Sequence, residues 1–213
     1  MKLQVALDTF SLETALDVLA RIAPWVDVAE IGTGLGISAG AAAISAVKSK
    51  YPDLEVLSDI KIMDGGESMA AFVLDAGADI VSVLGVAEDA TVAAAVGAAH
   101  ERGKRVLVDM IGVPDVATRA AKLDALGVDL ICVHTPYDLR ETVLPPTEAL
   151  VQVKAAVSHA VTVVTGGIKL DTVGTIVALG PDVVVVGSGI MAAPDPEAAA
   201  ERFHRAVSAG SPD

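Results

Sequence analysis

The sequence predicts a single-domain (β/α)8 TIM barrel. Eight short runs rich in β-branched residues recur along the chain, and alanine-rich segments with apolar residues at helical spacing separate them. The runs are nearly continuous in apolar residues, which is the pattern of parallel strands covered on both faces. The expected strands are residues 3–8, 26–32, 55–61, 79–85, 105–110, 129–134, 161–167 and 182–189.

The intervening segments read as helices. The clearest are residues 11–22, 88–103 and 195–207, and Ser11 and Asp195 are suited to cap the first and last of them. A doubly wound open sheet built from the same elements is the alternative fold. We expect the barrel to span residues 1–208, with 209–213 as a frayed tail and the Pro-rich connection 135–150 as an active-site loop.

Composition excludes several classes of function. The 213 residues carry a net charge of -13 and are 53% hydrophobic, so they would repel nucleic acid and anionic membranes. No apolar run approaches the length of a membrane span, and the N-terminus does not resemble a signal peptide. Cys132, the single cysteine, cannot form an internal disulfide and is expected to be a buried apolar residue. These features predict a cytoplasmic protein, and a phosphate ligand would need a local source of positive potential.

Functional residues of a TIM barrel lie at the C-terminal ends of its strands. In chain order these ends carry Asp8, Glu30, Asp59 with Lys61, Gly85, Asp109, His134, Thr165-Gly166-Gly167 and Gly187-Ser188-Gly189. Any one charged strand end is ordinarily a solvated terminus. Five ionisable strand ends directed at one mouth instead predict a catalytic site.

The segment Ser58–Gly66 places Lys61 among Asp59 and Asp64. Because side chains alternate along a strand, Asp59 and Lys61 should point to the same side, into the barrel. Neighbouring carboxylates favour the charged lysine and argue against a Schiff-base amine. We therefore expect Lys61 to be a fixed cation held by Asp59 and Asp64; the alternative is a solvated turn.

Glu30 and Asp59 should end adjacent strands and lie close enough to share a hard cation. Mg²⁺ prefers one or two carboxylates, with water and substrate oxygens as its other ligands. Zn²⁺ is a poorer fit because the cysteine and histidines form no cluster. The alternative is that Glu30 simply pairs with Lys61.

Glycine-rich turns end the last two strands, each expected to precede a helix. Backbone N–H groups at such turns commonly bind phosphate in barrels. His134 is the histidine at a strand end and is the candidate general base, with a buried rim histidine as the alternative. We expect His100, His159 and His204 to lie on helices at the surface.

The motif Asp59-x-Lys61-x-x-Asp64 resembles the signature of the orotidine 5'-phosphate decarboxylase suprafamily, and the resemblance extends along nearly the whole chain. It implies that Glu30 and Asp59 bind Mg²⁺, that Asp8 contacts substrate, that Lys61 stabilises an enediolate and that His134 moves a proton. It also implies phosphate binding at Gly166, Gly167, Gly187 and Ser188, with Thr165 beside them. In the family the residue matching Asp64 reaches into the partner's site, which implies a homodimer.

Within this suprafamily the chain is most similar to the 3-hexulose-6-phosphate synthases. The resemblance implies Mg²⁺-dependent aldol condensation of formaldehyde with D-ribulose 5-phosphate, through a metal-stabilised enediolate. The alternatives are decarboxylation of 3-keto-L-gulonate 6-phosphate and a barrel that binds sugar phosphates without turnover. Asp109 and Tyr137 favour the synthase, because the decarboxylases usually carry Glu and Arg there. Gly34, Pro136 and the segment 139–146 depart from the usual synthase and leave the sugar preference open.

Overall fold

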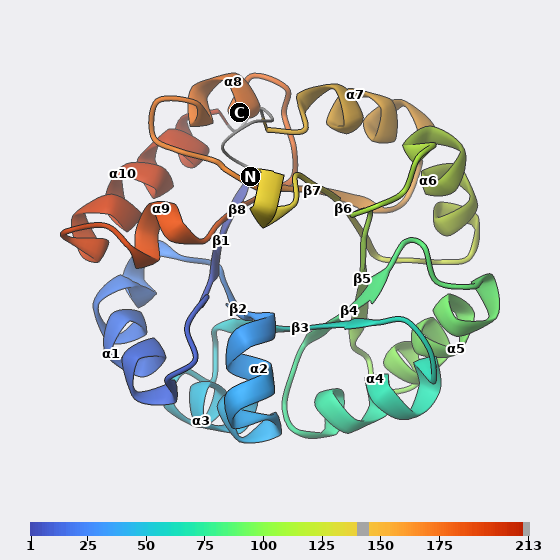
Figure 1. Ribbon diagram of the computed structural model, residues 1–213, viewed down its shortest axis with the longest axis horizontal. Helices are drawn as coiled ribbons and strands as arrows, with labels where there is room; N and C mark the ends of the chain where they lie inside the picture. Colours follow the sequence, from blue (N-terminus) through green and yellow to red (C-terminus); the bar gives the residue numbers. More distant parts are fainter. Residues whose placement is uncertain (140–144, 211–213) are drawn as a thin grey trace.

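The computed structural model, which describes residues 1–139 and 145–210, is a closed barrel of eight parallel strands in the order β1 to β8 (Figure 1). The closed ladder, in which β1 also pairs with β8, confirms the TIM barrel over the open sheet. The strands are β1 (Lys2–Ala6), β2 (Val28–Ile31), β3 (Glu55–Ile62), β4 (Ile80–Leu84), β5 (Arg105–Asp109), β6 (Leu130–His134), β7 (Val161–Thr165) and β8 (Val183–Val186).

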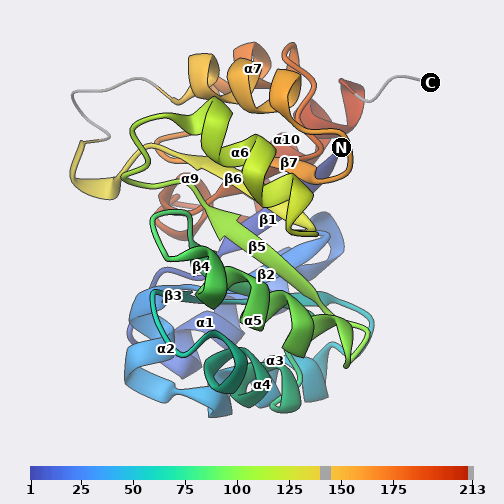
Figure 2. The same ribbon diagram turned by 90° about the vertical axis from the view of Figure 1, so that its right-hand side faces the viewer.

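Helices surround the strands on the outside, as the side view of Figure 2 shows for α5 and α6. Ser11 and Asp195 cap α1 and α10 as predicted, each accepting a hydrogen bond from a first-turn N–H. The helices are α1 (Leu12–Ile22), α2 (Thr33–Ala39), α3 (Ala41–Lys50), α4 (Gly66–Asp75), α5 (Asp89–His100), α6 (Val116–Ala125), α7 (Thr147–Ala156), α8 (Val173–Val177), α9 (Ser188–Met191) and α10 (Pro196–Ala209), with short 3-10 turns η1 (Ala23–Trp25) and η2 (Tyr137–Leu139).

Both faces of the strands are buried, which explains why the strands read as continuous apolar runs. One apolar cluster lies between the strands and the surrounding helices. A second fills the inside of the barrel and consists of Ala6, Val28, Leu57, Ile80, Leu107, Leu130, Cys132, Val163, Val183 and Val185. The barrel is thus a packed core with a polar layer at each end.

A repeated carboxylate contact closes the N-terminal end of the barrel. Each even-numbered strand is directly preceded by an aspartate, and its carboxylate accepts a hydrogen bond from the second N–H of the odd-numbered strand before it. The four pairs are Asp27 with Leu3, Asp79 with Val56, Asp129 with Val106, and Asp182 with Thr162. These contacts pair N–H groups at the rim of the sheet that would otherwise be unsatisfied.

Three charged side chains meet at the same end. Lys2 donates to Glu55 at 2.8 Å, and Arg105 donates to the other oxygen of the same carboxylate. All three residues begin their strands. These salt bridges therefore tie strands β1, β3 and β5 together at the N-terminal end.

Two of the predicted segments fall partly outside the described residues. Of the predicted loop 135–150, residues 140–144 lie outside them, while η2 precedes this gap and α7 follows it. Helix α10 continues to Ala209, one residue beyond the predicted boundary, and residues 211–213 of the predicted frayed tail lie outside the described chain. None of the described helices is both long and apolar enough to cross a bilayer.

Candidate active site

A cavity of about 640 Å³ opens at the C-terminal ends of the strands. The predicted site residues, except Asp64, line it: Asp8, Glu30, Asp59, Lys61, Asp109, His134, Thr165, Gly166, Gly167, Gly187 and Ser188. The turn η2 borders the same cavity through Tyr137. The barrel therefore gathers residues that are distant in sequence at one mouth.

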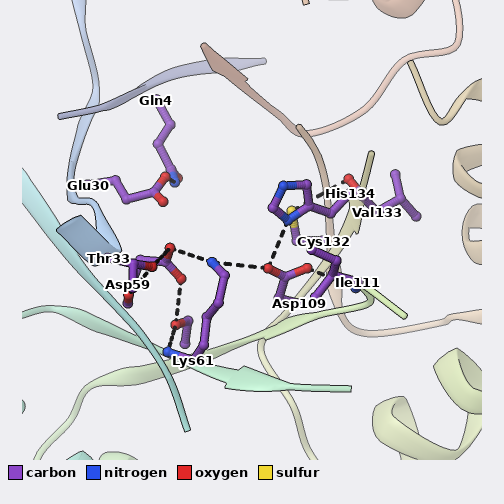
Figure 3. A network of polar contacts seen from close by, with 11 residues as sticks. Gln4, Glu30, Thr33, Asp59, Lys61, Asp109, Ile111, Cys132, Val133 and His134 are labelled. Atoms are coloured by element: carbon purple, nitrogen blue, oxygen red, sulfur yellow. Dashed lines mark hydrogen bonds and ion pairs between the residues drawn. The ribbon is translucent and has the colours of Figure 1, made fainter. Parts of the chain in front are cut away.

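Lys61 lies between two carboxylates at the centre of the site (Figure 3). Its Nζ is 2.5 Å from Oδ2 of Asp59 and 3.4 Å from Oδ2 of Asp109. Burial disfavours the charged amine, but Asp59 and Asp109 outweigh this effect and raise the pKa of Lys61 above its usual value. Lys61 is thus a paired cation, with Asp59 as one of its two carboxylates as predicted.

Asp64 does not help to hold Lys61, contrary to expectation. Asp64 is exposed between β3 and α4, and its carboxylate accepts a hydrogen bond from the N–H of Gly65. The second carboxylate beside Lys61 is that of Asp109, at the place predicted for Asp64. Gly85, which directly follows β4, is also structural: an added Cβ would lie 2.9 Å from Val113.

The backbone of β3 is irregular at Lys61. Pairing with β4 runs from Ser58–Val81 to Ile62–Val83, so three residues of β3 face one residue of β4. Lys61 has φ +48° and is the one non-glycine residue with positive φ in the described chain. Lys61 thus reaches Asp59 across a bulge, and not through the simple strand alternation that the sequence predicted.

Two hydroxyl groups orient Asp59. Thr33 donates to Oδ2 of Asp59 at 3.0 Å, and Ser82 donates to Oδ1 at 2.8 Å. Sequence reasoning missed both residues. Ser82 did leave a signal, because it is a polar residue inside the otherwise apolar run of β4.

Asp109 and His134 form a second polar pair. Oδ2 of Asp109 is 2.9 Å from Nδ1 of His134, and Oδ1 accepts from the N–H of Ile111. Burial alone would raise the pKa of Asp109, but His134 and Lys61 outweigh it and lower that pKa. An ionised Asp109 only accepts hydrogen bonds, so Nδ1 of His134 carries the proton and Nε2 is left to take one from a substrate.

Glu30 is held by a residue that the sequence analysis did not select. Nε2 of Gln4 donates to the Glu30 carboxylate at 2.6 Å, and the ion pairs of Lys61 are with Asp59 and Asp109. The alternative of a simple Glu30–Lys61 pair is therefore wrong. Burial, followed by repulsion from Asp59, raises the pKa of Glu30 well above its usual value. Oε1 of Gln4 is buried and has no hydrogen-bond partner in the described structure.

Asp8 lies between two glycines at the rim. A Cβ at Gly32 would be 2.5 Å from one carboxylate oxygen of Asp8, and a Cβ at Gly187 would be 2.6 Å from the other. Burial and the charge of Asp59 raise the pKa of Asp8. Glycine at these two positions leaves the space that the carboxylate occupies.

The two glycine turns differ from each other. Gly187 directly precedes the short helix α9, as predicted, whereas α8 begins only at Val173, well after Gly167. Gly166 has φ +101°, and a Cβ there would lie 2.3 Å from the carbonyl oxygen of Thr135. The expected helix directly after the first turn is therefore wrong, although both turns line the cavity.

The remaining candidates take structural roles. Cys132 is buried inside the barrel, and this burial, with the charge of Asp109, raises the pKa of its thiol. His100 lies exposed on α5 as predicted, whereas His204 lies on α10 but is half-buried, and the exposed His159 lies in the loop before β7. His100 pairs with Asp129, and His204 contacts the carbonyl of Trp25.

Residues 1–203 match the family model of the orotidine 5'-phosphate decarboxylase / HUMPS family. The chain belongs to this family. It is 42% identical to a 3-hexulose-6-phosphate synthase of Bacillus subtilis (strain 168) over 210 residues, which are 99% of this chain and 100% of the relative. The resemblance inferred from the sequence motifs is thus confirmed.

Solved structures agree with this assignment. A 3-hexulose-6-phosphate synthase from Salmonella typhimurium superimposes with a TM-score of 0.96 at 41% identity, covering 99% of this chain and 100% of its own. A KGPDC from Streptococcus mutans has a TM-score of 0.90 at 25% identity and covers 98% of this chain and 97% of its own. The chain is therefore considerably more similar in sequence to this synthase than to this KGPDC.

Proposed function

We propose that this protein is an aldehyde-lyase that condenses formaldehyde with D-ribulose 5-phosphate to give D-arabino-hex-3-ulose 6-phosphate, and that it catalyses the reverse reaction. The observation that carries the proposal is the joint placement of Lys61, Asp109 and His134 in one cavity. The relative with 42% identity over the whole chain bears the name of this activity.

In the proposed mechanism, Nε2 of His134 removes a proton from C1 of the ketose phosphate. The ammonium of Lys61 stabilises the negative charge of the enediolate that forms. C1 of the enediolate then forms a bond to the carbon of formaldehyde while the C2 carbonyl re-forms, and His134 returns the proton to the oxygen that came from formaldehyde. Asp109 keeps His134 in the tautomer that this cycle needs.

The phosphate of the substrate is proposed to bind at the glycine turns, where Gly166, Gly167, Gly187 and Ser188 line the cavity beside Thr165. Backbone N–H groups suit this role in an acidic protein, because they attract phosphate without a cluster of basic side chains. Asp8, beside Gly187 at the same opening, is proposed to contact substrate hydroxyls.

The residues at the mouth fit Mg²⁺. Glu30 and Asp59 repel each other, and the unpartnered Oε1 of Gln4 adds a further oxygen beside Glu30. A hard cation held by the two carboxylates would relieve this repulsion. When bound, Mg²⁺ would polarise substrate oxygens and offset the negative charge that develops on them.

We also propose a homodimer in which Asp64 of each chain reaches the site of the other. Asp64 is exposed and does not line the cavity of its own chain. Large apolar side chains are exposed on the neighbouring α2, α4 and connecting loops: Phe10, Ile37, Met63, Met69 and Phe72. A second copy would cover this apolar surface.

The test is to incubate the purified protein with Mg²⁺ and D-ribulose 5-phosphate, with and without formaldehyde, and to follow the pentose phosphate. We expect loss of the pentose phosphate only with formaldehyde, and no loss with the His134→Asn variant. Release of CO₂ from 3-keto-L-gulonate 6-phosphate without aldol activity would instead establish the decarboxylase. Ligand-induced thermal stabilisation with neither reaction would establish a binding protein.

A further inference from the structure

Ser82 occupies an unusual place in the barrel. It lies on β4, is 0% exposed and does not line the cavity. Its hydroxyl makes two hydrogen bonds to β3: it donates to Oδ1 of Asp59 at 2.8 Å and accepts from the N–H of Lys61 at 2.9 Å. One hydroxyl therefore joins a side chain and the backbone of two site residues.

The bulge in β3 explains why this hydroxyl is needed. Ser82 is the one residue of β4 that faces Asp59, Ile60 and Lys61, where the regular ladder is interrupted. The side chain supplies an acceptor to the N–H of Lys61 at this interruption. Lys61 is there in the left-handed region at φ +48°, which is unfavourable for a non-glycine residue.

We propose that Ser82 is a positioning residue for the proposed aldol reaction. Its donated hydrogen bond fixes Oδ1 of Asp59, which leaves Oδ2 for Thr33 and for the ammonium of Lys61. Its accepted hydrogen bond holds the left-handed backbone that directs Lys61 to this carboxylate. Ser82 acts through Asp59 and Lys61 and touches no substrate.

A structural role alone is the competing explanation, and the barrel offers a matched control. Thr162 is also buried, and its hydroxyl also bonds an aspartate and a backbone N–H: it donates to Oδ2 of Asp182 at 2.8 Å and accepts from the N–H of that residue at 3.4 Å. Asp182 lies at the N-terminal end of the barrel, away from the cavity lining. Thr162→Val and Ser82→Ala each remove a hydroxyl without removing other bulk.

The experiment measures two quantities for wild type, Ser82→Ala, Ser82→Thr and Thr162→Val. The first is the hydrogen-exchange rate of the Lys61 amide by NMR in the metal-free protein, relative to the amides of β5. The second is kcat and KM for formaldehyde-dependent consumption of D-ribulose 5-phosphate, with Tm recorded for each variant. If Ser82→Ala does not fold, Ser82→Cys keeps the volume and weakens both hydrogen bonds.

For Ser82→Ala we expect faster exchange of the Lys61 amide and a kcat about 10- to 100-fold lower, the range seen when an outer hydrogen-bond partner of a site is lost. KM should stay nearly constant because the phosphate turns are unchanged. Ser82→Thr should retain more of the kcat than Ser82→Ala. Thr162→Val should lower Tm and leave kcat within about twofold of wild type.

Two results for Ser82→Ala would overturn the proposal: an unchanged hydrogen-exchange rate of the Lys61 amide, or a kcat within about twofold of wild type. An equal fall of kcat in Thr162→Val would also overturn it. The inference rests on the proposed function only through kcat. If the wild-type protein shows no aldol activity, the proposed function fails. The exchange rate of the Lys61 amide then decides whether Ser82 holds this backbone.

Discussion

Carboxylates line both ends of this barrel, and the pKa values of Asp79 at one end and of Glu30 and Asp8 at the other are shifted in opposite directions. At the N-terminal end, Asp79 accepts from the backbone of Val56 and from Lys48 and Lys104, and these bonds outweigh burial and lower its pKa. At the C-terminal end, burial and the charge of Asp59 raise the pKa values of Glu30 and Asp8.

This difference indicates that the N-terminal end of the barrel contributes to stability and the C-terminal end to chemistry. Carboxylates at the N-terminal end are matched by donors within the chain, so they stabilise the folded state. At the mouth, Asp59 and Asp109 also have donors within the chain, but Glu30 and Asp8 keep a raised pKa and are left to interact with a cation and a substrate. The comparison predicts opposite effects for substitutions at the two ends.

The largest expected effect is at Lys61. In Lys61→Met we expect kcat/KM to fall about 10³-fold, the cost of losing a group that stabilises charge in the transition state. Steady-state kinetics with D-ribulose 5-phosphate and formaldehyde measure this effect. Lys104→Met, which removes a lysine paired with Asp79 at the other end, is the control and should keep its activity. Equal losses in both variants would break the comparison.

Next in size is Asp79→Ala at the N-terminal end. It removes an acceptor from Val56 and from two lysines, so we expect a loss of about 2 kcal/mol in the free energy of unfolding. For a chain of this size, that corresponds to a fall in Tm of roughly 4–8 °C. Thermal unfolding measures the fall, and kcat should remain at the wild-type value. A stable but inactive variant would contradict the assignment.

Glu30→Gln tests the comparison at the C-terminal end of the barrel, where we expect removal of a carboxylate charge to stabilise the fold. Because the folded-state pKa of Glu30 is raised, its ionisation opposes folding once the pH exceeds the ordinary carboxyl value. In EDTA we expect the variant to have a higher Tm than wild type, with a gain that grows as pH rises from 4 to 8. Aldol activity with Mg²⁺ should be lost. A lower Tm at pH 8 would show that Glu30 is stabilising as it stands.

The smallest effect is expected from Asp124. Its carboxylate accepts from the N–H groups of Ser158, His159 and Ala160, and these bonds outweigh desolvation and lower its pKa below the ordinary 3.8. Its stabilisation is therefore complete above that value and is lost as pH falls below it. Urea unfolding should show Asp124→Asn to be less stable than wild type at pH 7, with the difference narrowing toward pH 2. A difference in the free energy of unfolding that stayed constant from pH 7 to pH 2 would contradict this account.

The sequence predicts the strands and the members of the site well, for a physical reason. Parallel strands buried on both faces leave long β-branched runs, and their C-terminal ends converge. Glu30, Asp59, Lys61, Asp109 and His134 could be selected because each is an ionisable residue at the end of such a run. Their presence together in one cavity follows from the topology.

Side-chain partners were harder to predict. The bulge in β3 places positive φ on a lysine, and no glycine marks it in the sequence. Gln4 and Ser82 were visible as polar residues in apolar strands, but which carboxylate each would contact depends on the register between strands. The aspartates before the even-numbered strands were likewise visible, yet their partners lie on other strands.

The central claim is that His134, oriented by Asp109 and assisted by Lys61, removes the C1 proton of a ketose phosphate. Proton NMR of D-ribulose 5-phosphate in D₂O, with the protein and Mg²⁺ but without formaldehyde, measures this step directly. The account predicts that one C1 proton is replaced by deuterium with wild type and not with His134→Asn. Retention of both C1 protons with wild type, or equal exchange with His134→Asn, would contradict it.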